Sequence, residues 1–522
     1  MKRNHLLYIA ITWVGLALPA SGVFASQSQT GAASPADVQL SLQQAIEMAL
    51  EHNLNVVVSR LDTQVQAEGV NSAKGVYRPF LSASFNNLDS RSPAQNQLIG
   101  ATVLSSTRTD YSFFWQQQLN TGGAYNVTWQ NLRSTSNSAF TGFNPLYDAA
   151  VSAQITQPLA QNFGVDPNKQ RLLVAQNGER ISRSQLEMQV MATVRDVSFA
   201  YLNLVFSIRD LAVARQSLQL AQDLLRNNRI QVEVGTMAPI DVLEAEAEVA
   251  RREEAVIVAE EAIGRTQDVL KQLINDPESS EFWVSNYAPS DTPTMEEIDI
   301  DVDEAVRVAL QRRPIIEQSR IELETREYNV RFTKNQMLPQ LDIIGSFAMN
   351  GIGGNQLVRG DFAEDPTLII PGGYGDAIDQ VFGGDFRDWS VGISASYPLG
   401  NSTQVAQHAQ AQVAARQQRA VNDATEIFIA QEVRQTARAV DTNRKRIDAT
   451  RVARELAERR LEAEQKKFEV GMSTSFLIVQ AQRDLAQAAA QELRALIDYN
   501  QAIVAFEHSR GTILDRANVS VR

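Results

Sequence analysis

Two long segments of the chain place an apolar residue at every third or fourth position, and a glycine interrupts each segment once. The first segment covers 168–275 with its break at Gly235, and the second covers 401–510 with its break at Gly471. This spacing is typical of helices that pack as a coiled coil. We therefore predict two helical hairpins, and an arm of about 70 residues at ~1.5 Å each spans roughly 100 Å.

Five shorter segments alternate apolar residues with small or polar ones, which is the period of a β-strand. They cover 80–90, 110–133, 148–159, 340–350 and 387–399. The 110–133 segment is predicted to be a hairpin that turns at 120–123. Strands with one apolar face fit the wall of a transmembrane barrel, and they also fit a half-buried sheet in a soluble domain. The chain offers four strands, or six with the hairpin, so several chains must share a barrel.

The same architecture occurs twice in the chain. Residues 40–81 align without a gap on 300–341, and Gly235 with its flanking residues aligns on Gly471. The change of offset between the two alignments indicates an insertion of about 24 residues in the first copy, where the 110–133 hairpin lies. We assign the remaining segments by position: the copies cover 40–275 and 300–514, a linker covers 276–299, and a C-terminal tail covers 515–522.

The first residues indicate export. Two basic residues precede a short apolar run, so residues 1–25 resemble a secretory signal peptide with cleavage between Ala25 and Ser26. A retained N-terminal anchor is the alternative. Residues 26–39 are rich in Ser, Ala, Gln and Gly, and we predict a disordered tail. No later stretch approaches 18 consecutive apolar residues, so the sequence predicts no transmembrane helix.

Charge and composition narrow the function. The formal net charge is −13, which disfavours nucleic-acid binding. The chain has no cysteine, and its 4 histidines lack the spacing of a metal site. The sequence also lacks a nucleophile elbow and a phosphate-binding glycine loop. We therefore predict no enzymatic activity, no metal and no cofactor.

This arrangement resembles the TolC family of outer membrane factors, also called outer membrane efflux proteins, over nearly the whole mature chain. The resemblance depends on the duplicated order of helix, strands, long helix, turn and helix. The residues that carry it are Ala45, Ala49 and Leu50 with Ala305, Ala309 and Leu310, Pro79 with Pro339, the segments 157–159 and 397–399, and the Val-Gly pairs at 234–235 and 470–471.

The resemblance implies a homotrimer whose strands share one barrel in the outer membrane and whose helices form a periplasmic tunnel. In fold class this is a mixed α/β membrane protein with two internal repeats. The linker, the short helices and the C-terminus would form an equatorial girdle. The implied partners are outer membrane lipid, a periplasmic adaptor (membrane fusion protein) and an inner-membrane transporter of the RND, ABC or MFS type. The implied function is a passive, gated conduit in efflux or type I secretion.

The resemblance also implies a gate near the glycine turns, closed by inward helix bending and narrowed by acidic rings. Asp241 and Glu244 are the candidates, because a spacing of three places both on one helix face. Solvated acids on a helix face are the alternative. The second copy departs from this pattern with Leu477 and Gln480, and Phe468 occupies a position where some relatives have a gate tyrosine.

Docking of the adaptor is expected at the two turns. The candidate residues there are Val234, Gly235, Thr236, Val470, Gly471 and Met472. A different class of protein, a periplasmic coiled-coil scaffold or adaptor without a membrane pore, would explain the helices. It would not need the alternating strands, so the strands favour the conduit.

Overall fold

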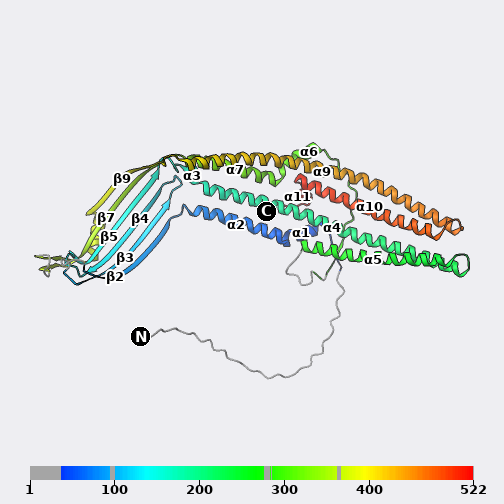
Figure 1. Ribbon diagram of the computed structural model, residues 1–522, viewed down its shortest axis with the longest axis horizontal. Coiled ribbons are helices and arrows are strands. Elements are labelled where there is room, and N and C mark those ends of the chain that lie inside the picture. Colours follow the sequence, from blue (N-terminus) through cyan, green and yellow to red (C-terminus); the bar gives the residue numbers. More distant parts are fainter. Residues whose placement is uncertain (1–36, 95–99, 275–282, 284, 361–365, 521–522) are drawn as a thin grey trace, which may run out of the picture.

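The computed structural model describes residues 37–94, 100–274, 283, 285–360 and 366–520. The molecule is elongated, with a β-sheet at one end and two helical hairpin tips at the other (Figure 1). This arrangement of long paired helices, a strand region and two repeats confirms the predicted fold class. The predicted signal peptide, with its cleavage between Ala25 and Ser26, lies outside the described residues.

The first copy runs from two short helices into four strands and then into a helical hairpin. Its elements are α1 (Leu42–His52), α2 (Leu54–Gly75), β2 (Phe80–Pro93), β3 (Val103–Gln118), β4 (Ala124–Ser136), β5 (Phe143–Pro158), α3 (Val165–Asn168), α4 (Gln170–Glu233) and α5 (Pro239–Ile274). Ser41 caps α1, since its hydroxyl accepts a hydrogen bond from the Gln44 backbone N–H at 3.2 Å.

The second copy repeats this order with two long strands instead of four. Its elements are α6 (Val302–Arg312), α7 (Pro314–Asn335), β7 (Gln340–Val358), β8 (Leu368–Ile370), α8 (Tyr374–Gly383), β9 (Phe386–Ser396), α9 (Ser402–Glu469) and α10 (Ser475–Arg510). The long helices end at glycines in both copies, because Gly235 (φ 79°) and Gly471 (φ 73°) have left-handed backbones. Glycine adopts this conformation without the steric penalty of a Cβ.

All neighbouring strands in the large sheet are antiparallel, in the order β2-β3-β4-β5-β7, and β9 also pairs with β7. The register places large apolar residues in rows on one face. One such row crosses six strands through Leu81, Trp115, Val127, Ala153, Phe347 and Trp389. The opposite face is polar, and Ser84 bonds Ser112 across it at 2.8 Å. The sheet therefore has one apolar face and one polar face, which is the pattern of a barrel wall between lipid and water.

Several strands extend beyond their predicted ends: β2 reaches Pro93, β7 reaches Val358, and β5 begins at Phe143. The prediction was too short because it followed apolar alternation alone. Beyond the apolar band the side chains become polar, for example Thr109 and Asn87, which bond each other at 2.8 Å. The backbone ladder continues there even though the hydrophobic signal has ended.

The glycine-rich and acidic composition of 350–384 predicts a long outward-facing loop, and the structure contradicts this prediction. It contains the end of β7, the short strand β8 and the helix α8. β8 also raises the strand number of the sheet above the predicted maximum of six. Ala377 and Val381 of α8 are buried against Ala149 of β5, on the apolar face of the sheet. A Cβ on Gly351 would lie 2.0 Å from the Ala377 carbonyl oxygen, so glycine permits this close approach.

Three segments assigned as tails or linker carry short elements near the middle of the molecule. β1 (Asp37–Leu40) lies in the predicted disordered tail and pairs in parallel with β6 (Asn286–Pro289) of the predicted linker. α11 (Ile513–Arg516) extends into the predicted C-terminal tail. The prediction of disorder was wrong at 37–39, because pairing between distant segments leaves no local pattern.

The helices pack through buried apolar seams. The helix α4 is long and apolar enough to cross a membrane, since its most apolar window has a mean hydropathy of 1.4. Half of that window is buried inside the protein, and Val197 and Leu204 are fully buried there. The apolar window of α4 is therefore the core seam of the helical region.

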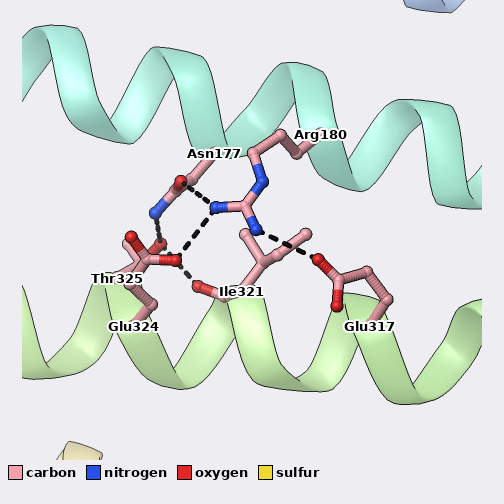
Figure 2. Close-up of polar contacts among 6 residues, drawn as sticks. All are labelled: Asn177, Arg180, Glu317, Ile321, Glu324 and Thr325. Carbon is pink, nitrogen blue, oxygen red and sulfur yellow. Dashed lines mark hydrogen bonds and ion pairs between the residues drawn. The ribbon is translucent and has the colours of Figure 1, made fainter. Parts of the chain in front are cut away.

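A polar cluster joins the two copies along α4 and α7. Figure 2 shows the Arg180 guanidinium between two carboxylates of α7, at 3.0 Å from Glu317 and 2.9 Å from Glu324. Beside it, the Asn177 side chain donates to Thr325 Oγ1 at 3.0 Å. These contacts fix the first copy against the second in the half of the helical region next to the strands.

Candidate functional site

The two hairpin tips are the best candidate site, because both leave large apolar side chains unburied. Val234 is 68% exposed at the first turn, and Val470 (69%) and Met472 (78%) are exposed at the second. Gly235, Thr236 and Gly471 are also exposed. All six predicted docking residues therefore lie on the surface of one chain, at the end farthest from the strands (Figure 1).

The predicted acidic pair lies just after the first turn. Asp241 is half-buried in the first turn of α5 and Glu244 is exposed one turn later. At the second tip, Leu477 and Gln480 occupy the matching positions and both are exposed. The tips are therefore chemically different, and only the first presents acids at these positions.

Phe468 does not take part in a polar link. It packs, half-buried, against an apolar cluster between the two hairpins. The cluster consists of Leu224, Leu461, Ile478, Val479 and Ala481. Because Leu224 belongs to the first hairpin and the others to the second, this cluster holds the hairpins together near their tips.

A polar contact that the sequence pattern does not reveal joins the two hairpins. Glu248 of α5 is 2% exposed, and its carboxylate binds the Arg483 guanidinium of α10 at 2.5 Å. Arg252 (2.8 Å) and Arg251 (3.1 Å), both on α5, approach the same carboxylate. One acid on the first hairpin is thus surrounded by three cations, one of which belongs to the second hairpin.

The electrostatics of this contact favour the ionised pair. Burial by itself raises the pKa of the Glu248 carboxyl, but the hydrogen bond from Arg483 and the charges of Arg252, Arg483 and Arg251 outweigh it. The net effect lowers the pKa below its usual 4.5. The same hydrogen bond raises the pKa of Arg483. The contact is therefore fully charged at neutral pH.

Two buried amides add further contacts between the hairpins. Asn228 of α4 is 0% exposed and donates to Ser475 Oγ at 2.7 Å and to the Asp241 carbonyl oxygen at 3.2 Å. Gln482 of α10 donates to the Leu220 carbonyl oxygen at 3.2 Å. Each of these polar side chains regains water if the hairpins separate, so this interface resists separation less than an apolar one of equal area.

The sequence offered no local signal for Glu248 and Arg483, because charged residues are frequent along all four long helices. Most of them form exposed pairs, such as Arg460 with Asp484 at 2.7 Å. Only the packing of one hairpin on the other distinguishes the buried acid. Within the described residues no group of three or more His, Cys, Asp or Glu side chains is placed to hold a metal ion.

The comparisons with known proteins decide the family. The sequence profile described as "Outer membrane efflux protein" matches residues 45–276 and again 305–512. The chain belongs to this family. Its two matched regions correspond to the two copies of the repeat, and members of the family are channels without enzymatic activity. The family match rules against a periplasmic scaffold without a pore.

Solved structures of similar fold are channels of the outer membrane. The chain is 14% identical to the Campylobacter jejuni CmeC outer membrane channel, with 96% of this chain and 94% of that chain covered and a TM-score of 0.64. It is 16% identical to the outer-membrane channel OprN, covering 96% and 99% with a TM-score of 0.65. The open state of the Neisseria gonorrhoeae MtrE channel is 17% identical, covering 94% and 95% with a TM-score of 0.62. No curated protein matches the chain.

Proposed function

We propose that the two hairpin tips form the periplasmic entrance of this outer membrane efflux channel and that a periplasmic adaptor docks on them. The family membership establishes a trimeric outer membrane channel of tripartite efflux systems, with its helices in the periplasm. The observation that carries the proposal is the exposed apolar surface of both tips. Its residues are Ile230, Val234, Ile240 and Leu243 in the first hairpin and Val470, Met472, Phe476 and Leu477 in the second.

Exposed apolar side chains in a watery compartment favour burial by a protein partner. Burying one large apolar side chain contributes about 2 kcal/mol, and a trimer presents six tips. An adaptor with apolar side chains on its own docking surface therefore fits this site. An inner-membrane transporter of the RND, ABC or MFS class would supply the energy.

The entrance opens, in this proposal, when the second hairpin moves away from the first. The contacts that resist this motion are the Glu248–Arg483 ion pair, the Asn228–Ser475 hydrogen bond and the apolar cluster around Phe468. An adaptor that binds the separated arrangement more tightly shifts the equilibrium by the difference in its two affinities.

The acids of the first tip select the permeating ion. Three copies of Asp241 and Glu244 would surround the entrance of a trimer, and a ring of like charges attracts cations. The second tip has Leu477 and Gln480 at the matching positions, so only the first copy of the repeat contributes to this selectivity.

Export to this location requires removal of residues 1–25 by cleavage between Ala25 and Ser26. The proposal includes two alternatives for the transported substrate: drugs in efflux, or proteins in type I secretion. Separate assays of drug export and of protein export distinguish the two.

The docking proposal is tested by charging one tip. In cells that depend on this channel, Val470→Asp with Met472→Asp should abolish drug efflux, while the purified trimer keeps its conductance in a planar bilayer. Val452→Asp is the matched control: it is also exposed on α9, about 27 Å before the turn, and should keep efflux. Normal efflux by the double variant, with trimers present in the outer membrane, would remove the tips as the docking site.

A further inference from the structure

The hairpin β3–β4 has no counterpart in the second copy of the repeat. In the second copy, β7 follows α7 and β9 leads into α9, so two long strands connect two helices. In the first copy, β2 follows α2 and β5 leads through α3 into α4, and β3 and β4 stand between them. Among the described residues, each chain thus carries six long strands, which adjoin the four helices α2, α4, α7 and α9.

The extra hairpin is part of the sheet and does not lie over it. β3 pairs with β2 from Phe80↔Gln116 to Pro93↔Val103 without a shift of register, and β4 pairs with β5 from Ala124↔Thr156 to Ser134↔Leu146. β2 and β5 therefore form their facing backbone hydrogen bonds with the hairpin and do not pair with each other. Removing it would leave two edges to be paired anew.

Its two faces continue those of the neighbouring strands. Phe113 and Trp129 lie on the apolar face with their ring centroids 5.7 Å apart, and both are exposed in the single chain. Ser112 and Thr128 point to the opposite, polar face by the alternation of the strands. A strand pair with one apolar face and one polar face fits a barrel wall between lipid and water.

The periplasmic turn of the hairpin is seated on the strand–helix junction. The Gly164 backbone N–H donates to the Thr121 carbonyl oxygen at 3.1 Å, and Thr121 Oγ1 donates to Gln157 at 3.1 Å. Gly122 has φ 90°, and a Cβ there would lie 2.1 Å from the Asn162 carbonyl oxygen. The turn therefore ends at the level where the other strands become helices.

The edges of the sheet are suited to close on other copies. The first strand, β2, and the last long strand, β9, run in opposite directions, because every neighbour between them is antiparallel. Placing β9 of one chain beside β2 of the next therefore continues the antiparallel order around a ring. Almost every residue of these two strands is exposed in the single chain.

We propose that three chains close an eighteen-stranded barrel, in which β3–β4 forms part of the wall and widens the outer exit of the channel. This rests on the proposed conduit function and on the trimer of the family. At ~4.8 Å between strands and a tilt of ~40°, twelve strands give a backbone diameter of about 24 Å and eighteen give about 36 Å. Side chains leave a lumen of roughly 20 Å, so the exit passes bulky solutes and size selection lies at the periplasmic tips.

The absence of cysteine makes the wall testable by single cysteines. Ser112→Cys and Thr128→Cys on the polar face of the hairpin should react with a charged, membrane-impermeant methanethiosulfonate and reduce the single-channel current. Phe113→Cys and Trp129→Cys on the apolar face should not react. Ser346→Cys on β7, whose hydroxyl bonds Ser390 across the polar face at 2.8 Å, is the positive control.

Reaction at Ser346→Cys without reaction at Ser112→Cys and Thr128→Cys would overturn the barrel proposal alone, since the channel would conduct through a wall that excludes the hairpin. No conductance by any trimer would overturn the conduit itself. The width is tested with a maleimide–polyethylene glycol of about 7 Å radius added from outside, which fits a lumen of roughly 20 Å diameter but not the lumen of about 8 Å that twelve strands would leave. It should label Ser346→Cys in the full chain, and failure to enter would contradict the eighteen-stranded size.

Discussion

Replacing Arg483 with glutamine removes the guanidinium of the second hairpin from the buried Glu248 carboxylate. Two hydrogen bonds to a charged group are lost, at 2.5 Å and 3.1 Å. Each such bond contributes about 1.5–3 kcal/mol, but Arg483 is 43% exposed and Arg251 and Arg252 remain beside the acid. We therefore expect a net loss of about 2 kcal/mol per chain, which shifts the closed-to-open ratio of one hairpin about 30-fold.

Single-channel recording in a planar bilayer measures this shift directly. The Arg483→Gln trimer should show a larger open fraction and a larger mean conductance than the unmodified trimer. Arg460→Gln is the matched control, because Arg460 pairs with Asp484 within the second hairpin and does not join the two hairpins. Equal open fractions in the Arg483 and Arg460 variants would refute the role of the buried ion pair as a latch.

Three further predictions concern pH and the turns. Because the pKa of the Glu248 carboxyl is lowered in the folded protein, its ion pair stabilises the closed hairpins above about pH 4.5 and loses this effect only as the pH falls below that value. In bilayer recordings the open fraction should therefore stay constant from pH 8 to 5 and rise below pH 4.5. Burial and the nearby Arg195 lower the pKa of His508 from 6.5 to about 4, so the folded protein keeps the ring neutral and is most stable above pH 6.5. This stability is lost as the pH falls from 6.5 toward 4, and the thermal midpoint should fall over the same range. The His508→Gln variant should show a smaller decrease of its thermal midpoint. Gly471→Ala should destabilise the second tip by about 1 kcal/mol, because the residue has a left-handed backbone with φ 73°. Gly264→Ala should stabilise α5, because alanine favours a helix interior and a Cβ there meets open space. Thermal unfolding should show a lowered midpoint for the first variant and a raised midpoint for the second.

The long helices and their turns could be predicted because their signals are local. An apolar residue at every third or fourth position specifies a buried seam over the whole length of α4 and α9. Gly235 and Gly471 mark their ends because each adopts a backbone that other residues avoid. The alternation in β3 and β4 likewise specified a hairpin, since the two faces of the wall meet different solvents.

The helix α8 has a local signal in the sequence, but the residues around it point the other way. Tyr374, Ala377, Ile378 and Val381 follow helical spacing, but glycines and acids around them indicated a loop. The β1–β6 pairing had no such signal, because it joins residues roughly 250 positions apart in two four-residue strands. Short, distant pairings are decided by the packing around them and not by the segments themselves.

One part of the candidate site could be predicted from the sequence, and another part could not. Its exposed turn residues, from Val234 to Met472, follow from the repeat and were named from sequence. The contact between Glu248 and Arg483 depends on how α5 and α10 approach each other, and the sequence places many similar charges along both helices. Glu248 differs from the other acids because it is buried, and its burial follows from the packing of the two hairpins.

A gated conduit through the outer membrane must be recoverable from that membrane as an assembled, conducting channel. The direct measurement is detergent extraction of the outer membrane fraction, isolation of the protein, and planar-bilayer recording of the isolated species. We expect a trimer that conducts ions in discrete steps and closes reversibly. A monomeric, water-soluble product without conductance would contradict it.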